Sequence, residues 1–364
     1  MWQIDELLTL AMKNQVSDVH ITVGVAPIFR LNGILMPLDG LEMANMLGLD
    51  TNSVAKLSPE DTEQLAKQIM NQHQYKKFIE TGDIDFPYEI PGGGRFRVNA
   101  FKQRGSAALA IRLINADILS FQQLGLPDTL AHLCQKPRGL VLVTGPTGSG
   151  KSTTLATMID YINNHYCQHI ITLEDPIEYV HTHKRSIVNQ REVGRDTKGF
   201  AHALRSAMRE DPDVILVGEM RDLETISIAI TAAETGHLVF GTLHTSSAAQ
   251  TIDRIIDVFP PHQQPQIRAQ LANTVLGVLA QQLIPRIDKP GRVAALEVMV
   301  ATPAIRNLIR EGKTYQIISQ IQTGAKHGMQ SLDACLRQLA INQIISREEA
   351  INRAADPGSL EKML

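Results

Sequence analysis

Residues 145–152, GPTGSGKS, have the types and the spacing that bind the phosphates of a nucleotide. They fit the P-loop pattern G-x-x-x-x-G-K-[ST] at every fixed position. The glycines let the backbone turn its N–H groups toward phosphate oxygens, and a helix that follows adds its positive N-terminal end. We expect Lys151 to reach the β- and γ-phosphates of ATP, and the Ser152 hydroxyl to complete the shell of a Mg²⁺ ion. The alternative is a glycine-rich turn without a ligand. The predicted nucleotide-binding residues are Gly145, Pro146, Thr147, Gly148, Ser149, Gly150, Lys151, Ser152 and Thr153.

Polar residues follow three apolar segments downstream of this loop. Glu174-Asp175, Glu219 and His244 each come at the end of a predicted strand. Strands of a parallel sheet present their carboxyl ends to the ligand crevice. Glu219 ends a Walker B-like segment, with Glu in place of the usual Asp, and can polarise the attacking water or order water bound to Mg²⁺. Glu219 is therefore the candidate catalytic carboxylate, with helix capping as its alternative. His244 would lie where the γ-phosphate is sensed, with a purely structural role as its alternative.

The segments around these residues predict how they are positioned. Residues 140–143 are typical of a buried strand, and residues 153–163 predict a helix. Strands and helices then alternate, which predicts a mainly parallel sheet covered on both faces. After Pro260-Pro261 we expect one long helix that ends near Pro285, followed by the apolar segment 293–300.

The N-terminal part of the chain has a different pattern. Residues 83–114 alternate with a period of two, which predicts a half-exposed antiparallel sheet. Arg95, Arg97 and Arg112 lie on its exposed face and, by themselves, indicate only a solvated surface. Residues 115–125 lack a strong period and predict an interdomain linker.

Three local signals precede that sheet. Asn32-Gly33 predicts a type I′ hairpin turn. Ser58 and Pro59 are typical of the N-cap and the first position of a helix. Residues 40–56 show weak periodicity and predict a loop or a loosely packed insertion.

Composition narrows the functional class. The chain has 364 residues, enough for two or three domains, and a net charge of −3, which provides no basic field for nucleic acid. Its three cysteines are far apart, which favours a reducing compartment and argues against a cysteine zinc site. No apolar run reaches about 18 residues. We therefore expect a cytoplasmic protein with no nucleic-acid partner and no transmembrane segment.

Together the motifs resemble the secretion ATPase superfamily, and within it the PilT-type retraction motors of type IV pili. The shared segments are GPTGSGKST (145–153), ITLEDPIEYVH (171–181), NQREVGRDT (189–197), VILVGEMRDLET (214–225) and TGHLVFGTLHTSSA (235–248). AIRNLIREGK (304–313) is similar to a motif associated with retraction. The four-cysteine motif and the extra N-terminal domain of the extension motors are absent, which favours retraction over extension.

The resemblance implies an α/β fold class with three parts. A PAS-like α+β domain would span residues 1–114 and be followed by the linker 115–125. A RecA-like P-loop ATPase core would span residues 126–300, and a C-terminal helical region or bundle residues 301–364.

The resemblance also implies a hexameric motor that hydrolyses ATP with Mg²⁺ to drive pilus retraction, pilin disassembly and twitching motility. ATP would bind between the N-terminal domain of one subunit and the core of another. Arg97 and Arg112 would act as fingers on the γ-phosphate, Glu178 would be the Asp-box acid, and His237 and His244 the His-box pair. The implied partners are an inner-membrane pilus platform protein and an accessory PilU-type ATPase, at the inner face of the cytoplasmic membrane.

Three other functions fit some of the same motifs. A PilU-type accessory motor shares almost every box. A RecA-like DNA-dependent motor would require stimulation by single-stranded DNA, which the net charge does not favour. A nucleotide-gated scaffold would bind ATP without hydrolysing it, and Glu219 argues against that function.

Overall fold

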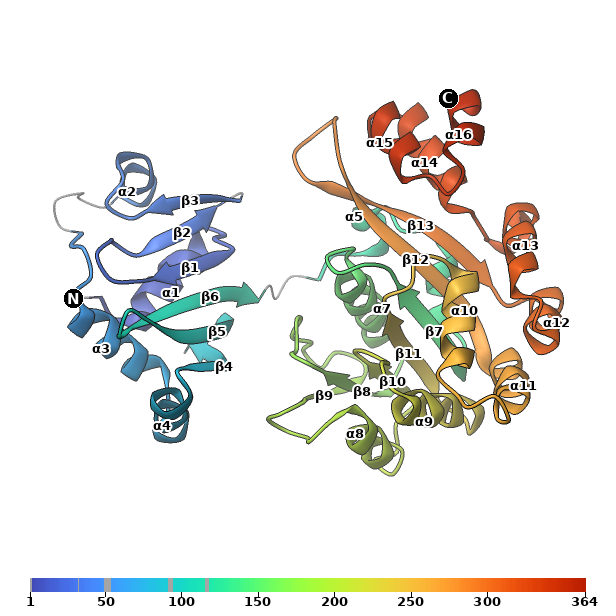
Figure 1. The fold of residues 1–364 in the computed structure, drawn as a ribbon, viewed down its shortest axis with the longest axis horizontal. Coiled ribbons are helices and arrows are strands. Elements are labelled where there is room, and N and C mark those ends of the chain that lie inside the picture. The colour runs from blue at the N-terminus through green and yellow to red at the C-terminus, as the bar shows by residue number, and fades with distance from the viewer. Residues whose placement is uncertain (1, 32, 49–53, 91–93, 115–117) are drawn as a thin grey trace. The chain divides into compact units, whose positions relative to one another are not determined.

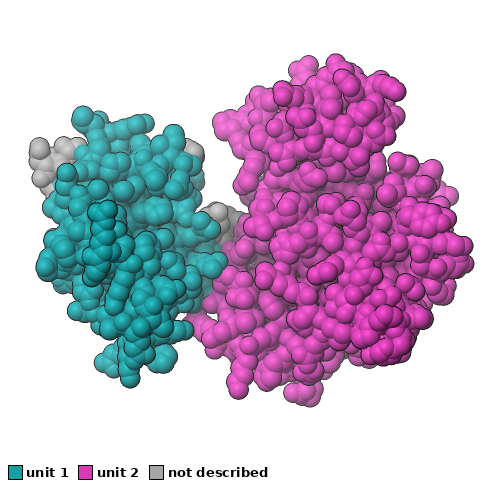
Figure 2. All heavy atoms as spheres, viewed as in Figure 1, with its two compact units in different colours: residues 1–116 teal, residues 117–364 magenta. Residues whose placement is uncertain are grey.

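The computed structural model describes residues 2–31, 33–48, 54–90, 94–114 and 118–364. The chain divides into two compact units, coloured separately in Figure 2: unit 1, Met1–Ala116, and unit 2, Asp117–Leu364. Each unit has its own apolar core, so each is described by itself.

Unit 1 is a six-stranded antiparallel sheet covered by helices. Its strands follow the order β3-β2-β1-β6-β5-β4. The predicted alternation is confirmed, because Phe96, Val98 and Ala100 are buried in the core while Arg97 is exposed. The helices are α1 (Ile4–Lys13), α2 (Leu41–Leu47), α3 (Pro59–Ile69) and α4 (Gln72–Thr81), and the strands are β1 (Asp18–Ile21), β2 (Ile28–Leu31), β3 (Ile34–Pro37), β4 (Asp83–Ile90), β5 (Gly94–Gln103) and β6 (Ser106–Ile114).

The local predictions for unit 1 have different outcomes. Ser58 caps α3, accepting a hydrogen bond from the backbone of Asp61, as expected. The predicted turn includes Asn32, which lies outside the described residues, although Leu31 and Ile34 pair across it. The prediction of a loop over 40–56 is wrong for Leu41–Leu47, because this segment forms α2. Only Met43 and Ala44 of that short helix are buried, so its apolar pattern is too sparse to recognise in the sequence. Residues 49–53 lie outside the described part.

Unit 2 is a seven-stranded sheet with helices on both faces (Figure 1). Its strands follow the order β13-β12-β7-β11-β10-β8-β9; β12 and β13 pair antiparallel, and the other neighbours pair parallel. The strands are β7 (Gly139–Thr144), β8 (His169–Glu174), β9 (Ile187–Glu192), β10 (Val214–Val217), β11 (Leu238–Leu243), β12 (Val275–Pro285) and β13 (Arg292–Val300). The α-helices are α5 (Phe121–Leu124), α6 (Thr129–Cys134), α7 (Lys151–His165), α8 (Phe200–Ala207), α9 (Leu223–Glu234), α10 (Ala248–Asp257), α11 (Gln264–Thr274), α12 (Pro303–Glu311), α13 (Ile317–Thr323), α14 (Leu332–Ile341), α15 (Arg347–Arg353) and α16 (Pro357–Met363).

Alternate residues of the central strands enter two different apolar clusters. Leu140 and Leu142 of β7 pack with α8 to α11, whereas Val141 and Val143 of the same strand pack with α6 and α7. Because both sides of β7 are covered, all six of its residues are buried. This two-sided burial explains why the sequence shows continuous apolar runs here.

Two predictions for unit 2 are corrected. The linker predicted over 115–125 ends earlier, because Phe121 begins α5 and packs in the core against Tyr161; residues 115–117 lie outside the described part. The long helix predicted up to Pro285 is wrong. Helix α11 ends at Thr274, and Val275–Pro285 forms β12, which lies between β7 and β13. A run that is apolar at nearly every position fits a buried strand as well as a buried helix.

The C-terminal helices lie in two groups. Helix α12 is capped by Thr302 and packs with α13 against the main core. Helices α14, α15 and α16 form a separate apolar cluster over the ends of β12 and β13 (Figure 1). None of the helices among the described residues has the length and apolar character needed to cross a bilayer.

Candidate nucleotide-binding site

The P-loop connects buried strand β7 to the 15-residue helix α7. Gly145, Gly148 and Gly150 adopt φ angles of 142°, 78° and 87°, in the region that favours glycine. The Lys151 ammonium donates hydrogen bonds to the carbonyls of Gly145 (2.8 Å) and Pro146 (3.0 Å). Burial lowers the pKa of Lys151, while the charges of Glu219 and Glu178 oppose that change. Lys151 is therefore held over the loop within the field of both carboxylates.

The P-loop rests on Gln281, a residue of β12 that the sequence did not reveal. The buried amide of Gln281 donates to the carbonyl of Ser149 (2.7 Å) and accepts from the hydroxyl of Thr154 (2.7 Å). A Cβ at Gly145 would lie 2.3 Å from the carbonyl oxygen of Gln281, so only glycine allows this close approach. Because residues 275–285 were predicted as a helix, the sequence did not place Gln281 on a strand beside the P-loop. The only sequence signal for it is a polar residue inside an apolar run.

A cavity of about 370 Å³ gathers most of the predicted site residues. Its walls come from the P-loop and from the carboxyl ends of β8, β10 and β11, which follow β7 in the sheet in the order β7-β11-β10-β8. The prediction that these strand ends meet is thus confirmed. The predicted residues that line the cavity are Thr147, Gly148, Ser149, Gly150, Lys151, Ser152, Thr153, Glu178, Glu219 and His244.

Glu219 and His244 form a hydrogen-bonded pair in this cavity. The Nε2 of His244 lies 2.7 Å from Oε1 of Glu219, and the Arg221 guanidinium donates to the same carboxylate oxygen. Burial by itself would raise the pKa of Glu219, but the hydrogen bonds from Arg221 and His244 hold that pKa below its ordinary value. Glu219 is therefore ionised at neutral pH and can orient a water molecule or accept its proton.

Glu178 lies on a loop that two residues of β9 hold in position. The Gln190 amide donates to the carbonyl of Tyr179 (2.8 Å) and accepts from the backbone N–H of His181 (2.8 Å). Glu192 accepts from the backbone N–H of Ile177 (3.2 Å). The exposed Glu178 side chain thus comes from a fixed loop. Both β9 residues fall in the 189–197 segment, but periodicity did not indicate this positioning role.

The same loop meets the P-loop helix through Tyr179. The hydroxyl groups of Tyr179 and Thr153 are 2.8 Å apart. Glu174, at the end of β8, accepts from Thr172 (2.6 Å) and Gln190 (3.1 Å), and burial raises its pKa. Through its hydrogen bond with Gln190, Glu174 belongs to the support of the loop.

His237 lies away from this cavity. It directly precedes β11, whereas His244 directly follows it. Its Nδ1 is 3.0 Å from the carbonyl oxygen of Ala232, and it does not line the cavity. The structure brings only one histidine of the predicted pair to the site.

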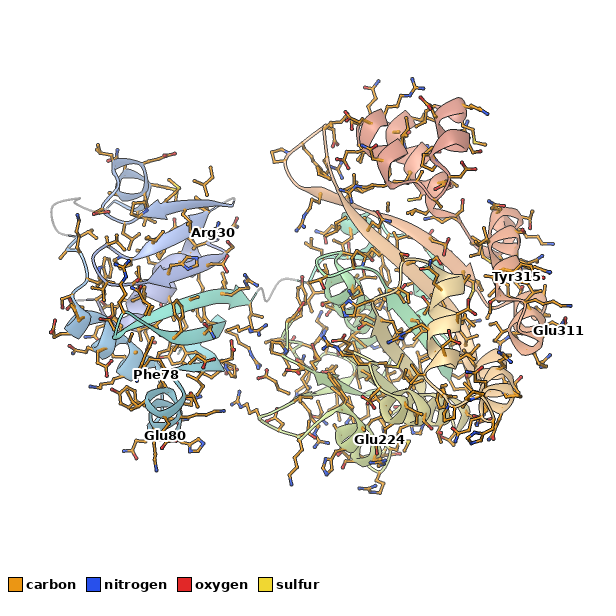
Figure 3. The ribbon with its side chains drawn as sticks, viewed as in Figure 1. Arg30, Phe78, Glu80, Glu224, Glu311 and Tyr315 are labelled. Atoms are coloured by element: carbon orange, nitrogen blue, oxygen red, sulfur yellow. The ribbon has the colours of Figure 1, made fainter. Side chains whose placement is uncertain are left out.

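Arg97 and Arg112 are in unit 1, on the exposed face of its sheet. They are directly opposite each other on β5 and β6. Arg112 donates to Asp18 (2.8 Å), and Arg97 lies 3.9 Å from Asp85. Arg30, labelled in Figure 3, approaches Asp18 from β2 at 3.8 Å. Burial by itself would raise the pKa of Asp18, but the hydrogen bond from Arg112 holds that pKa below its ordinary value.

The residues around the cavity fit a nucleoside triphosphate and Mg²⁺. Ser149 has a buried hydroxyl with no hydrogen-bond partner among the described residues, and a phosphate oxygen would supply one. The Ser152 hydroxyl also lines the cavity, as a hard oxygen ligand suited to Mg²⁺. The N-terminus of α7 favours an anion at this position.

Comparison with known proteins agrees with this site. A family model described as "Type II/IV secretion system protein" matches residues 86–351. The chain is 51% identical to the type IV pilus "retractation" ATPase PilT of Pseudomonas aeruginosa, over 97% of this chain and 98% of that protein. It is 50% identical to a twitching motility protein of Neisseria gonorrhoeae, over 85% of this chain and 82% of that protein. A crystal structure of the pilus retraction motor PilT with bound ADP superposes with a TM-score of 0.90 at 49% identity and covers 100% of both chains. The chain therefore belongs to the type II/IV secretion system protein family and, within it, to the PilT-type ATPases.

Proposed function

We propose that this protein is a hexameric motor that hydrolyses ATP to drive type IV pilus retraction. The observation that carries the proposal is the single cavity in which the P-loop, Glu178, Glu219 and His244 meet. The similarity over nearly the whole chain to a protein named as a pilus retraction ATPase supports the mechanical function. Retraction would return pilins to the membrane and so power twitching motility.

Each residue of the cavity has a separate part in hydrolysis. Lys151 and the loop N–H groups would hold the phosphates, and Ser152, with Glu219 through water, would hold Mg²⁺. Mg²⁺, when bound, neutralises phosphate charge. Glu219 would accept the proton of the attacking water, with its orientation set by the His244 hydrogen bond. Glu178 adds a second carboxylate on the loop held by Gln190.

We further propose that Arg97 and Arg112 complete the site of a neighbouring protomer. Two guanidinium groups side by side on an exposed sheet face form a surface suited to phosphate oxygens.

The Arg97→Ala variant tests this cross-subunit site. Loss of an arginine finger costs about 10³-fold in turnover or more, so hydrolysis should fall by that factor while nucleotide binding stays measurable. Lys76→Ala is the matched control, because Lys76 is a cation on the exposed surface of α4 in the same unit. Normal hydrolysis by Arg97→Ala would contradict the cross-subunit site.

The domain organisation belongs to the same proposal. Unit 1 would be the PAS-like domain, the sheet of unit 2 the RecA-like core, and residues 301–364 the appended helical bundle. Closure and opening of unit 1 against unit 2, about the segment that joins them, would convert hydrolysis into motion that an inner-membrane platform protein receives. The motor would therefore act at the inner face of the cytoplasmic membrane, with an accessory PilU-type ATPase as a further partner.

Deletion of the gene tests the mechanical function. Excess surface pili without twitching would support retraction, and bald cells would contradict it. Full complementation by the PilT-type ATPase of another species, but not by its PilU-type protein, would exclude an accessory role. Stimulation of hydrolysis by single-stranded DNA would favour a DNA motor instead.

A further inference from the structure

We propose that a second cavity of unit 2 binds the orthophosphate product before it leaves the protein, an inference that rests on ATP hydrolysis in the first cavity. This second cavity, here called the arginine pocket, has a volume of about 330 Å³, and Arg221, Arg254 and Thr245 line it. Glu219 and His244 line both cavities. The catalytic pair is therefore a wall that the nucleotide site and the arginine pocket share.

The two arginines and the threonine of the arginine pocket come from three parts of the same unit. Arg221 lies in the turn after β10, Thr245 follows β11, and Arg254 comes from α10. Buried apolar side chains such as Met220 and Leu243 form part of its lining. The polar groups thus stand on a rigid apolar base, at the edge of the sheet where hydrolysis takes place.

The charges of the pocket suit an oxyanion. Guanidinium groups match the paired oxygens of phosphate and donate strong, charge-assisted hydrogen bonds. Among the described residues, Arg254 has no ion pair, including with the exposed carboxylates of Asp253 and Asp257 on its own helix. Arg221 is bound to Glu219, and its side chain is 75% exposed. Opposing them in the pocket is one carboxylate, that of Glu219.

The chemistry of hydrolysis supplies the ligand at this wall. The water oxygen forms a bond to the γ-phosphorus, the bond from that phosphorus to the bridging oxygen of ADP breaks, and the water proton passes by way of Glu219 to solvent. The resulting orthophosphate dianion lies beside the ionised Glu219, which repels it. ADP, seated over the P-loop, occupies the other side. The two arginines on the far side of the shared wall would attract the anion and direct its departure.

Binding of inorganic phosphate tests the pocket directly. We expect the full-length, ADP-loaded protein to bind inorganic phosphate, and Arg254→Gln to weaken that binding about tenfold or more by calorimetry, with ADP affinity unchanged. Arg254→Lys keeps the charge and should retain part of the affinity. Lys326→Gln, a change of an exposed cation in the short 3-10 helix Ala325–His327 after α13, is the control and should bind like the parent. Equal phosphate affinity in Arg254→Gln and the parent would overturn the proposal.

Single-turnover kinetics test the role of the pocket in product release. In Arg254→Gln the phosphate formed after acid quench should appear at the parent rate, whereas free phosphate detected by a fluorescent phosphate-binding protein should appear several-fold later. An equal fall in both signals would mean that Arg254 acts on the chemical step, which contradicts the proposal. If the parent itself does not hydrolyse ATP, the proposed function fails, and the calorimetry still decides whether the pocket binds phosphate.

Discussion

Replacing Gln281 by Leu should separate the P-loop from its support without disturbing the nucleotide contacts themselves. Gln281 lies behind the loop, 3% exposed, and does not line the nucleotide cavity. Leu has a similar size, so the substitution removes two hydrogen bonds and leaves the apolar packing of β12 nearly unchanged. The carbonyl of Ser149 and the hydroxyl of Thr154 would then be buried without their 2.7 Å partners.

The magnitude follows from those two groups. A buried polar group that loses its partner costs about 1–3 kcal/mol. The Thr154 hydroxyl is in α7, so the loss of its hydrogen bond to Gln281 should appear mainly as a lower stability of the fold. The Ser149 carbonyl is in the loop itself, so the loss of the hydrogen bond that it accepts from Gln281 favours loop conformations that do not bind phosphate. Through that term alone, nucleotide affinity should fall about 5- to 150-fold, since about 1.4 kcal/mol is a factor of ten.

The assay is titration of the protein with a fluorescent ADP analogue, together with thermal unfolding. Gln282→Leu is the matched control, because Gln282 is the next residue of β12 and its side chain points to the opposite face of the sheet. We expect weaker ADP binding only in Gln281→Leu. If that variant lost stability but bound ADP as tightly as the parent, the amide would support the fold and not the loop, and the reasoning would be refuted.

Three further predictions concern the carboxylates and their partners. Glu219→Gln should lower the rate of hydrolysis by about 10²- to 10⁴-fold, because an amide cannot accept the proton of water; more than a tenth of the parent rate would argue against its role. Gln190→Leu should lower kcat with little change in KM for ATP, because the loop that bears Glu178 loses its hydrogen bonds; a loss of thermal stability alone would make Gln190 merely structural. The lowered pKa of Asp18 means that its ion pair stabilises unit 1 above the unfolded pKa of about 3.8, and that this contribution is lost as pH falls through the folded pKa. Asp18→Asn should therefore be less stable than the parent at pH 7, and the two stabilities should become similar below about pH 4. Unfolding can be followed by the fluorescence of Trp2, the one tryptophan, which packs on the core of unit 1. A difference in stability that stays constant across that range would contradict the assignment.

The positions of the P-loop, Glu219 and His244 could be predicted from the sequence because the rule behind them is topological. Once the strands are parallel and adjacent, their carboxyl ends must meet, whatever the details of packing. The separation of His237 from the site follows from the same rule, since it precedes the strand that His244 follows.

The supports of the site could not be predicted in this way. Gln281 and Gln190 act through side-chain hydrogen bonds to backbone groups 132 and 11 residues away in the chain. No local pattern encodes a pairing of that kind. The incorrect prediction of a helix over β12 also prevented recognition of Gln281 as a support. A continuous apolar run carries no period that distinguishes a strand buried on both faces from a buried helix.

The opposed arginines of unit 1 are difficult to explain by stability alone. Like charges directly across a strand pair are destabilising, yet Arg97 and Arg112 face each other on β5 and β6. Asp18 neutralises Arg112 through a 2.8 Å hydrogen bond, while Asp85 remains 3.9 Å from the half-exposed Arg97. Arg97 is therefore the more available guanidinium, because binding an external phosphate would break no strong contact of its own. This availability of Arg97 supports the proposal that it contacts a phosphate from outside unit 1.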